Sequence, residues 1–269
     1  HAKKAGHTGS LDPLATGMLP ICFGEATKFS QYLLDADKAY DLTALLGVTT
    51  DTGDSEGNVL STKTVPPISK EKLLGCLDAL TGQIEQVPPM YSALKHNGQA
   101  LYTYARRGET IERKARPVTI YEIKCREFDG KSLHLSVKCS KGTYIRTLAE
   151  AIGEALGVGA HVTALHRIYT AGFEEESMYK LDDLIIKAED LGVQACEQYL
   201  LPLERAVQHW PKFLVSDKQA QSLLQGQPVR DVHAISQGIV RLYSTEGFLG
   251  LGECVVDGVL KAKRLLSIS

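Results

Sequence analysis

Residues 6–17 read GHTGSLDPLATG, and this stretch carries more structural information than any other part of the chain. Its three glycines allow backbone conformations that other residues avoid, and they permit close approach to a ligand. Pro13 restricts the preceding Asp12 to an extended or turn conformation. The stretch therefore predicts a stiff loop that presents one carboxylate among small hydroxyl side chains, and such loops often carry function.

Two interpretations of Asp12 follow from this loop. Asp before Pro commonly caps a turn, and a carboxylate on a rigid loop is also suited to catalysis. The loop has neither the Gly-Lys-Ser/Thr ending of a phosphate-binding P-loop nor the GxGxxG pattern of a dinucleotide site. The residues alone leave the cap and the catalyst both open.

The hydrophobic pattern outside this loop predicts a mixed α+β fold, because helices and strands do not alternate regularly. Helices are expected around residues 26–33, 70–80, 142–157 and 181–191, and strands around 38–47, 118–128 and 133–139. Ser69 is expected to cap the second helix, which Gly82 closes, and Gly157 to end the third. After about Glu204 short strands and turn glycines predict a second, small β-rich domain.

Composition narrows the class of protein. No apolar run reaches the roughly 20 residues of a membrane helix, and no signal peptide is visible, so we expect a cytoplasmic protein without a membrane partner. The six cysteines form no CxxC pair and have no zinc-ligand spacing, so we expect reduced thiols and no metal. The net charge is −2, but residues 95–126 hold eight Lys/Arg against three Asp/Glu. Excess basic charge suits phosphates, although an ordinary solvated surface explains it too.

Several motifs resemble one family. The run from His7 to Gln31, within GHTGSLDPLATGMLPICFGEATKFSQYL, resembles the signature of the TruB-type transfer-RNA pseudouridine-55 synthases. Three further stretches are similar to the same family, namely KAY at Lys38–Tyr40, VPPMYSALK at Val87–Lys95 and SKGTYIRTL at Ser140–Leu148. The end of the chain, Gly247 to Leu266, resembles the small RNA-binding PUA-type domain of these enzymes.

The resemblance implies a fold, a reaction and a partner. It implies a catalytic domain with a mixed, largely antiparallel sheet at residues 1–205 and a PUA-like domain at residues 206–269. It implies an isomerase that converts the uridine at position 55 in the T-arm loop of tRNA to pseudouridine, by base flipping and without cofactor. The T-arm loop and the acceptor end of tRNA are the expected partners, with Lys261, Lys263 and Arg264 suited to the acceptor end. No protein partner is implied, and we expect a monomer.

The resemblance also implies roles for matching residues. Asp12 corresponds to the essential aspartate, and Arg146 to an arginine that pairs with it. Tyr40 corresponds to a tyrosine stacked on the target base, Tyr144 is expected to bind substrate, and Leu165 to line the uracil pocket. His7 corresponds to a histidine that enters the RNA loop where the flipped nucleotide left. Without the resemblance, Tyr40 reads as a core residue, His7 as a loop histidine and Arg146 as an exposed helix charge.

Two departures from the family pattern are visible. The chain begins at His1, without Met and directly before the motif, so we expect the family's N-terminal strand and Lys-Pro turn to be missing. His166 stands beside Arg167 where two arginines are often found, which weakens one expected RNA contact.

Two other functions remain open. A tRNA-folding chaperone would use the same surface without turnover, and would not need Asp12. A nucleoside or glycoside hydrolase normally uses two cooperating carboxylates. Asp41 and Glu25 are the nearest candidates in sequence for the second one. Arg106, Arg107, Arg113, Lys114 and Arg116, interleaved with Tyr102 and Tyr104, are the residues expected to contact RNA.

Overall fold

The computed structural model describes residues 4–173, 176–230, 232, 237–255 and 258–267. By packing, the chain divides into two compact units. The first unit comprises residues 1–8, 20–34 and 175–269, and the second comprises residues 9–19 and 35–174. The boundary predicted after residue 205, between a catalytic domain and a PUA-like domain, does not coincide with the division into these two units. It stays a prediction.

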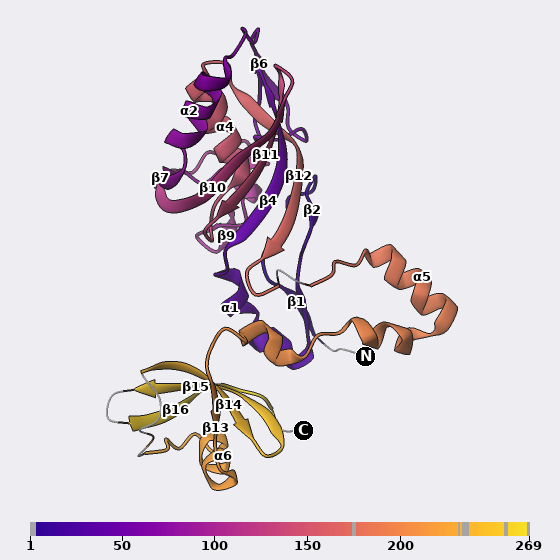
Figure 1. Cartoon of the computed structure of the whole chain (residues 1–269), viewed down its shortest axis with the longest axis vertical. Coiled ribbons are helices and arrows are strands. Elements are labelled where there is room, and N and C mark those ends of the chain that lie inside the picture. The colour runs from indigo at the N-terminus through magenta and orange to yellow at the C-terminus, as the bar shows by residue number, and fades with distance from the viewer. Residues whose placement is uncertain (1–3, 174–175, 231, 233–236, 256–257, 268–269) are drawn as a thin grey trace. The chain divides into compact units, whose positions relative to one another are not determined.

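The second unit is built on a six-stranded sheet (Figure 1). Its order is β2-β12-β4-β11-β10-β7, and only the β2–β12 pair is parallel. The strands are β2 (Thr16–Gly17), β4 (Lys38–Leu46), β7 (Gly82–Gln86), β10 (Arg116–Phe128), β11 (Ser132–Cys139) and β12 (Ala160–Thr170). The predicted mixed, largely antiparallel sheet is confirmed.

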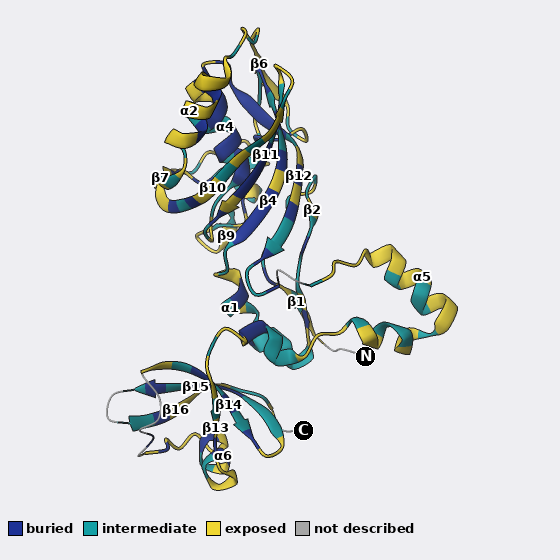
Figure 2. Ribbon diagram, in the orientation of Figure 1, coloured by how far each residue is buried: buried dark blue, intermediate teal, exposed yellow. Residues whose placement is uncertain are grey.

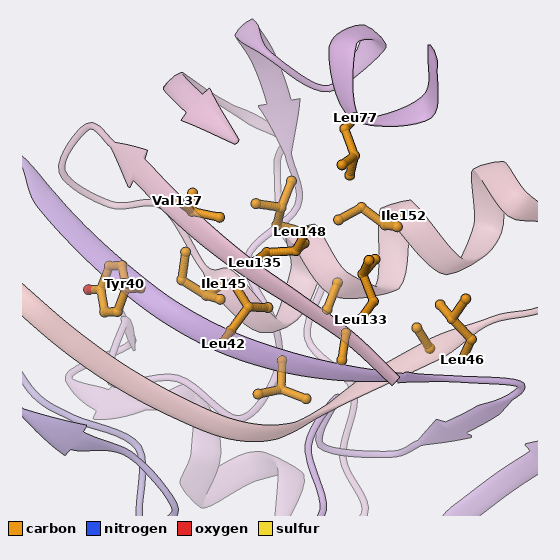
Figure 3. Close-up of a cluster of buried hydrophobic side chains, with 14 of the residues drawn as sticks. Tyr40, Leu42, Leu46, Leu77, Leu133, Leu135, Val137, Ile145, Leu148 and Ile152 are labelled. Atoms are coloured by element: carbon orange, nitrogen blue, oxygen red, sulfur yellow. The ribbon is translucent and has the colours of Figure 1, made fainter. Parts of the chain in front are cut away.

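Two helices cover one face of this sheet, α2 (Lys70–Ala79) and α4 (Ile145–Leu156) (Figure 1). Alternate residues of β4 and β11, among them Leu42 and Leu133, pack against Leu148 of α4 in the main hydrophobic core. Figure 3 shows these side chains between the strands and the helix, with Tyr40 among them. The alternation that predicted these strands therefore reflects burial on one face only.

Two of the predicted helix ends are confirmed and two are wrong. The Ser69 side chain accepts a hydrogen bond from the Lys72 backbone N–H, as an N-cap residue does. Gly157 ends α4 in the left-handed conformation, with φ of 86°. Helix α2 ends at Ala79 with Leu80 as its C-cap, and Gly82, which was expected to close it, begins β7. Helix α4 begins at Ile145 rather than near residue 142, because the backbone of its N-cap residue, Tyr144, is still extended. The remaining elements of this unit are the hairpins β5 (Val48–Thr50) with β6 (Val59–Thr62) and β8 (Lys95–His96) with β9 (Gln99–Ala100), and helix α3 (Leu101–Ala105).

The first unit contains the predicted β-rich C-terminal region. A four-stranded sheet has the order β13-β14-β15-β16, formed by Lys212–Leu214, Gly238–Ser244, Gly247–Val255 and Val259–Leu265. Its other elements are β1 (Ala5–His7), β3 (Ile21–Phe23), η1 (Gly24–Lys28), α1 (Ser30–Leu34), α5 (Leu181–Leu191), η2 (Val193–Tyr199), η3 (Leu203–Val207) and α6 (Asp217–Leu224). Helix α5 confirms the helix predicted at 181–191, and Figure 2 shows that it has no buried residue.

One expectation is wrong in this unit, and one helix was not predicted. The helix expected at 26–33 is a 3-10 helix followed by the short α1, because the backbone N–H of Phe29 bonds to Ala26 three residues back. Helix α6 was not predicted, although Ser216 and Gln219 form a capping box at its start. That pattern of Ser followed three residues later by Gln is a helix signal in the sequence.

Candidate active site

Backbone pairing with β12 and a hydrogen bond from the Arg167 guanidinium group hold the loop that carries Asp12 in place. Gly17 of β2 pairs with Arg167 of β12, and its φ of 103° brings a hypothetical Cβ to 2.2 Å from the Arg167 carbonyl oxygen. Only glycine fits this approach. Arg167 is fully buried, and its Nε donates to the Met18 carbonyl oxygen at 2.6 Å. The loop is therefore fixed to the sheet a few residues after Asp12.

The Asp12 carboxylate faces Arg146. Arg146 Nη2 donates to Asp12 Oδ1 at 2.9 Å. The turn that begins at Asp12 is closed by its backbone and not by its side chain, since the Asp12 carbonyl oxygen accepts from the Ala15 N–H at 2.8 Å. The ionic contact favours the catalytic interpretation over the cap.

Arg146 is buried, with 4% of its side chain exposed, so it is not the exposed helix charge that was the alternative. Its Nη2 also donates to the Tyr91 carbonyl oxygen at 2.8 Å, and Nη1 donates to the Thr52 carbonyl oxygen at 2.7 Å. A cation in the first turn of α4 opposes the helix dipole. The surrounding carboxylates and carbonyls offset that cost and fix the guanidinium.

Asp54 is a second carboxylate on this arginine, and sequence reasoning missed it. Its Oδ2 lies 3.6 Å from Arg146 Nη1. Asp54 is buried and accepts hydrogen bonds from the Thr52 hydroxyl at 2.6 Å and the Glu56 N–H at 3.1 Å. In the sequence it stands in a turn rich in Asp and Gly, and nothing there signals a partner 92 residues away.

Burial and charge act in opposite directions on the pKa of Asp12. The Arg146 cation lowers this pKa, as a neighbouring positive charge does. Desolvation by burial is larger, and the nearby Asp54 adds to it, so the pKa of Asp12 lies above its ordinary value. Arg146 limits this rise.

The predicted base-binding residues lie on the core side of the sheet. Tyr40 and Leu165 are buried in the hydrophobic core cluster, and Tyr144 is half-buried immediately before α4. Burial raises the pKa of both tyrosines, and the charge of Asp12 adds to it in each case. Tyr40 and Tyr144 therefore both lie close enough to Asp12 to be influenced by its charge, and Arg146 contacts Asp12 directly. Their contacts with a uracil base stay a prediction.

His7 lies on β1 in the first unit, where it pairs with Ile21 of β3. Its expected entry into the RNA loop stays a prediction. In the C-terminal sheet, Lys261, Lys263 and Arg264 are exposed on β16, and Lys263 pairs with Glu253 at 3.0 Å. Their expected contact with an acceptor end likewise stays a prediction.

The basic stretch divides into exposed and structural residues. Arg106, Lys114 and Arg116 are exposed. Arg113 donates to the carbonyl oxygens of Ile111 and Pro88, both at 3.1 Å. Arg113 therefore holds its own segment in place, which makes it a poorer phosphate contact than its neighbours.

The two carboxylates named for a hydrolase do not join Asp12. Glu25 pairs with Lys28 in the first unit at 2.6 Å. Asp41 alternates with the core residues Tyr40 and Leu42, so it lies on the opposite face of the sheet, where Ser136 donates to it. Asp54 is 3% exposed, and its carboxylate contacts Arg146 and accepts from the Thr52 hydroxyl. The hydrolase is therefore disfavoured.

A hollow of about 700 Å³ lies in the second unit, lined by Asp41, Thr43, His134, His166 and their neighbours. Thr43 and His134 alternate with core residues, as Asp41 does, so these polar side chains line the face away from the core. Asp12 and Arg146 do not line it. The described residues contain no group of three or more His, Cys, Asp or Glu side chains placed to hold a metal ion.

Comparison with known proteins agrees with this geometry. Residues 1–145 match the model of the TruB family pseudouridylate synthase N-terminal domain. Residues 146–208 match a tRNA pseudouridylate synthase B C-terminal domain, and residues 211–266 match a pseudouridine synthase II TruB C-terminal domain. The chain belongs to the TruB family of pseudouridylate synthases.

Relatives in the TruB family cover the whole chain. The tRNA pseudouridine synthase B of Coxiella burnetii (strain RSA 493 / Nine Mile phase I) is 51% identical over 267 residues, which is 99% of this chain and 86% of that protein. That of Legionella pneumophila subsp. pneumophila (strain Philadelphia 1) is 47% identical over 270 residues, which is 100% of this chain and 88% of that protein.

Solved structures share the fold. The crystal structure of a Cbf5-Nop10-Gar1 complex contains a chain with a TM-score of 0.73 and 26% identity, covering 98% of this chain and 77% of that one. A structure of an H/ACA RNP bound to a substrate RNA containing 2'-deoxyuridine also gives a TM-score of 0.73, at 23% identity, covering 99% of this chain and 77% of that one. The predicted fold class is thus confirmed.

Among the described helices, none is long and apolar enough to cross a membrane.

Proposed function

We propose that this chain converts the uridine at position 55 in the T-arm loop of tRNA to pseudouridine, in the cytoplasm, with Asp12 as the catalytic carboxylate. The observation that carries the proposal is the 2.9 Å contact between Asp12, on a glycine-containing loop, and Arg146, in the first turn of α4, in a chain of the TruB family. The names of the relatives, tRNA pseudouridine synthase B, support tRNA as the substrate.

The reaction places definite demands on these residues. The bond between the ribose C1′ and the uracil nitrogen breaks, the uracil turns, and a bond forms between C1′ and a ring carbon. The hydrogen of that carbon leaves as a proton, and the released ring nitrogen takes up a proton. No group is imported and nothing is oxidised, so no cofactor is required. An ionised carboxylate beside the sugar supplies either a nucleophile or a base, and Arg146 favours the ionised form of Asp12.

The target base must leave its stack before it reaches Asp12. Tyr40 supplies an aromatic face, Leu165 an apolar wall, and Tyr144 a third contact. RNA loops are usually recognised by splayed bases that stack on aromatic rings. We therefore expect recognition of loop shape and of a flipped base rather than of a long sequence.

The test is to incubate the purified protein with unmodified tRNA and to map pseudouridine at each uridine. We expect pseudouridine at position 55 and none in a tRNA that carries cytidine there. A T-arm stem-loop should also be a substrate, and a linear RNA of the same sequence a poor one. Tight binding without pseudouridine would favour the chaperone function, and equal turnover of stem-loop and linear RNA would contradict shape recognition.

A further inference from the structure

Gln86, the last residue of β7, has a buried side-chain amide that contacts a single backbone position. It is 4% exposed, whereas Gln83 and Glu85 on the same strand are exposed. Its Oε1 accepts from the Tyr144 N–H at 3.0 Å, and its Nε2 donates to the Tyr144 carbonyl oxygen at 3.3 Å. Both ends of the amide are therefore used on one residue.

That residue begins the helix that carries Arg146. Tyr144 is the N-cap residue of α4, and its side chain makes no capping hydrogen bond. Its carbonyl oxygen accepts the first helical hydrogen bond, from Leu148 N–H at 3.1 Å. Gln86 thus fixes the backbone at a helix start that lacks an ordinary cap. Tyr144 and Arg146 both project from this start.

Gln86 also leads into a second segment that reaches Arg146. Residues 87–94 follow it directly, and the Tyr91 carbonyl oxygen in this segment accepts from Arg146 Nη2. The same Nη2 donates to Asp12 Oδ1. The start of α4 and the segment after β7 therefore both orient this guanidinium nitrogen, and Gln86 joins the two.

We propose that Gln86 is a positioning residue that sets the geometry of Tyr144 and Arg146 relative to Asp12. The inference rests on the proposed function of Asp12. Gln86 acts through the Tyr144 backbone, because its own amide is buried and occupied on both sides. Small displacements of catalytic groups reduce rates strongly, so loss of this contact lowers turnover more than it lowers RNA affinity.

The first test compares Gln86→Met with Gln83→Met. Methionine is close in volume to glutamine and removes both hydrogen bonds, whereas Gln83 is exposed on the same strand. For Gln86→Met we expect faster amide hydrogen exchange at Tyr144 and a single-turnover rate at saturating RNA reduced by about tenfold, as two lost neutral hydrogen bonds predict. The dissociation constant for RNA should change less than about threefold, as a change confined to the helix start predicts. Gln83→Met should match the unsubstituted protein in all three measurements.

The second test uses Gln86→Glu and pH. A protonated carboxyl group can donate one hydrogen bond and accept another, which are the two that the Gln86 amide makes with Tyr144, whereas an ionised carboxylate can only accept. Burial raises the pKa of a carboxyl group placed there. The rate of Gln86→Glu relative to the unsubstituted protein should therefore rise as the pH falls. A merely space-filling role would leave this ratio independent of pH.

The outcomes separate this inference from the proposed function. A protein that forms no pseudouridine fails the proposed function, while amide exchange at Tyr144 still reports whether Gln86 holds that backbone. Unchanged exchange in Gln86→Met overturns the positioning role. An equal loss of RNA affinity and rate also overturns it. If Gln86→Met does not fold, the pH dependence of Gln86→Glu decides.

Discussion

The charge of Asp12 is set by three competing influences, and this predicts a pH dependence. Burial raises its pKa, Arg146 lowers it and Asp54 raises it. The active form is the carboxylate, so the single-turnover rate should rise with pH through the Asp12 pKa. Replacing Arg146 with Gln removes the lowering influence. We therefore expect the rising limb of the pH–rate profile to move to higher pH, together with a lower maximum.

The control for that profile is Arg146→Lys, which keeps the charge but not the several donors of the guanidinium group. The rising limb of the Arg146→Lys profile should lie closer to that of the unsubstituted protein, although the rate of this variant should also fall. If the rising limb of Arg146→Gln lay at the same pH as that of the unsubstituted protein, the account of the Asp12 pKa would be contradicted.

The same shift predicts an effect on stability. A carboxyl group whose pKa is raised by folding binds its proton more tightly in the folded state, so its contribution to stability is lost as the pH rises through that pKa. At neutral pH the ionised Asp12 therefore costs stability. Asp12→Asn should have a melting temperature equal to or above that of the unsubstituted protein, measured by calorimetry at pH 7. A clear decrease would show that the contact with Arg146 outweighs burial.

At the scale of elements, the close packing of α4 on β12 predicts opposite effects of one substitution at two glycines. A Cβ on Gly153 of α4 would lie 2.3 Å from the Ala160 nitrogen, whereas a Cβ on Gly75 of α2 meets nothing within 4 Å. Alanine is normally favoured over glycine in a helix by about 1 kcal/mol. We expect Gly75→Ala to raise the free energy of unfolding by up to this amount. Gly153→Ala should lower it by about 1–3 kcal/mol, the usual cost of overpacking.

Denaturant unfolding of both variants measures this difference. Two variants of equal stability would show that α4 moves away from β12 without cost. The rate of pseudouridine formation is an independent readout, because α4 carries Arg146: it should fall in Gly153→Ala and stay unchanged in Gly75→Ala.

Strands and long helices were predictable because their patterns are local. The alternation at Tyr40, Leu42 and Ala44 and the apolar spacing of α4 each lie within a dozen residues. The pairing of Arg146 with Asp12 came from the family resemblance, since spacing alone left Arg146 as an exposed charge. Asp54 was missed because a turn aspartate is common. Its contact with Arg146 joins residues 92 positions apart, and the chain fold alone determines such a contact.

The distribution of basic residues over the whole molecule predicts which of them bind RNA and how RNA affinity depends on salt concentration. The net charge is −2, yet Arg106, Lys114 and Arg116 are exposed in the basic stretch. If they neutralise phosphates, replacing all three with Glu should weaken RNA binding and reduce its salt dependence, because fewer counterions are released.

The matched control replaces Lys63, Lys70 and Lys72 with Glu. These lysines are exposed in the same unit, and the substitutions change the net charge equally. Filter binding at several salt concentrations should show a large loss for the first triple variant and a small one for the second. Equal losses in both would mean that net charge alone governs affinity, and that the basic stretch is not the RNA face.

The most direct measurement of the central claim compares Asp12→Asn with Asp41→Asn on unmodified tRNA. Asp41 is exposed on the opposite face of the sheet and serves as the matched aspartate. We predict that Asp12→Asn forms no pseudouridine at position 55 while its dissociation constant for tRNA stays within about tenfold, since one contact is commonly worth roughly 1 kcal/mol. Asp41→Asn should keep both turnover and binding. Pseudouridine formation by purified Asp12→Asn at the unsubstituted rate would contradict the assignment of Asp12 as the catalytic residue.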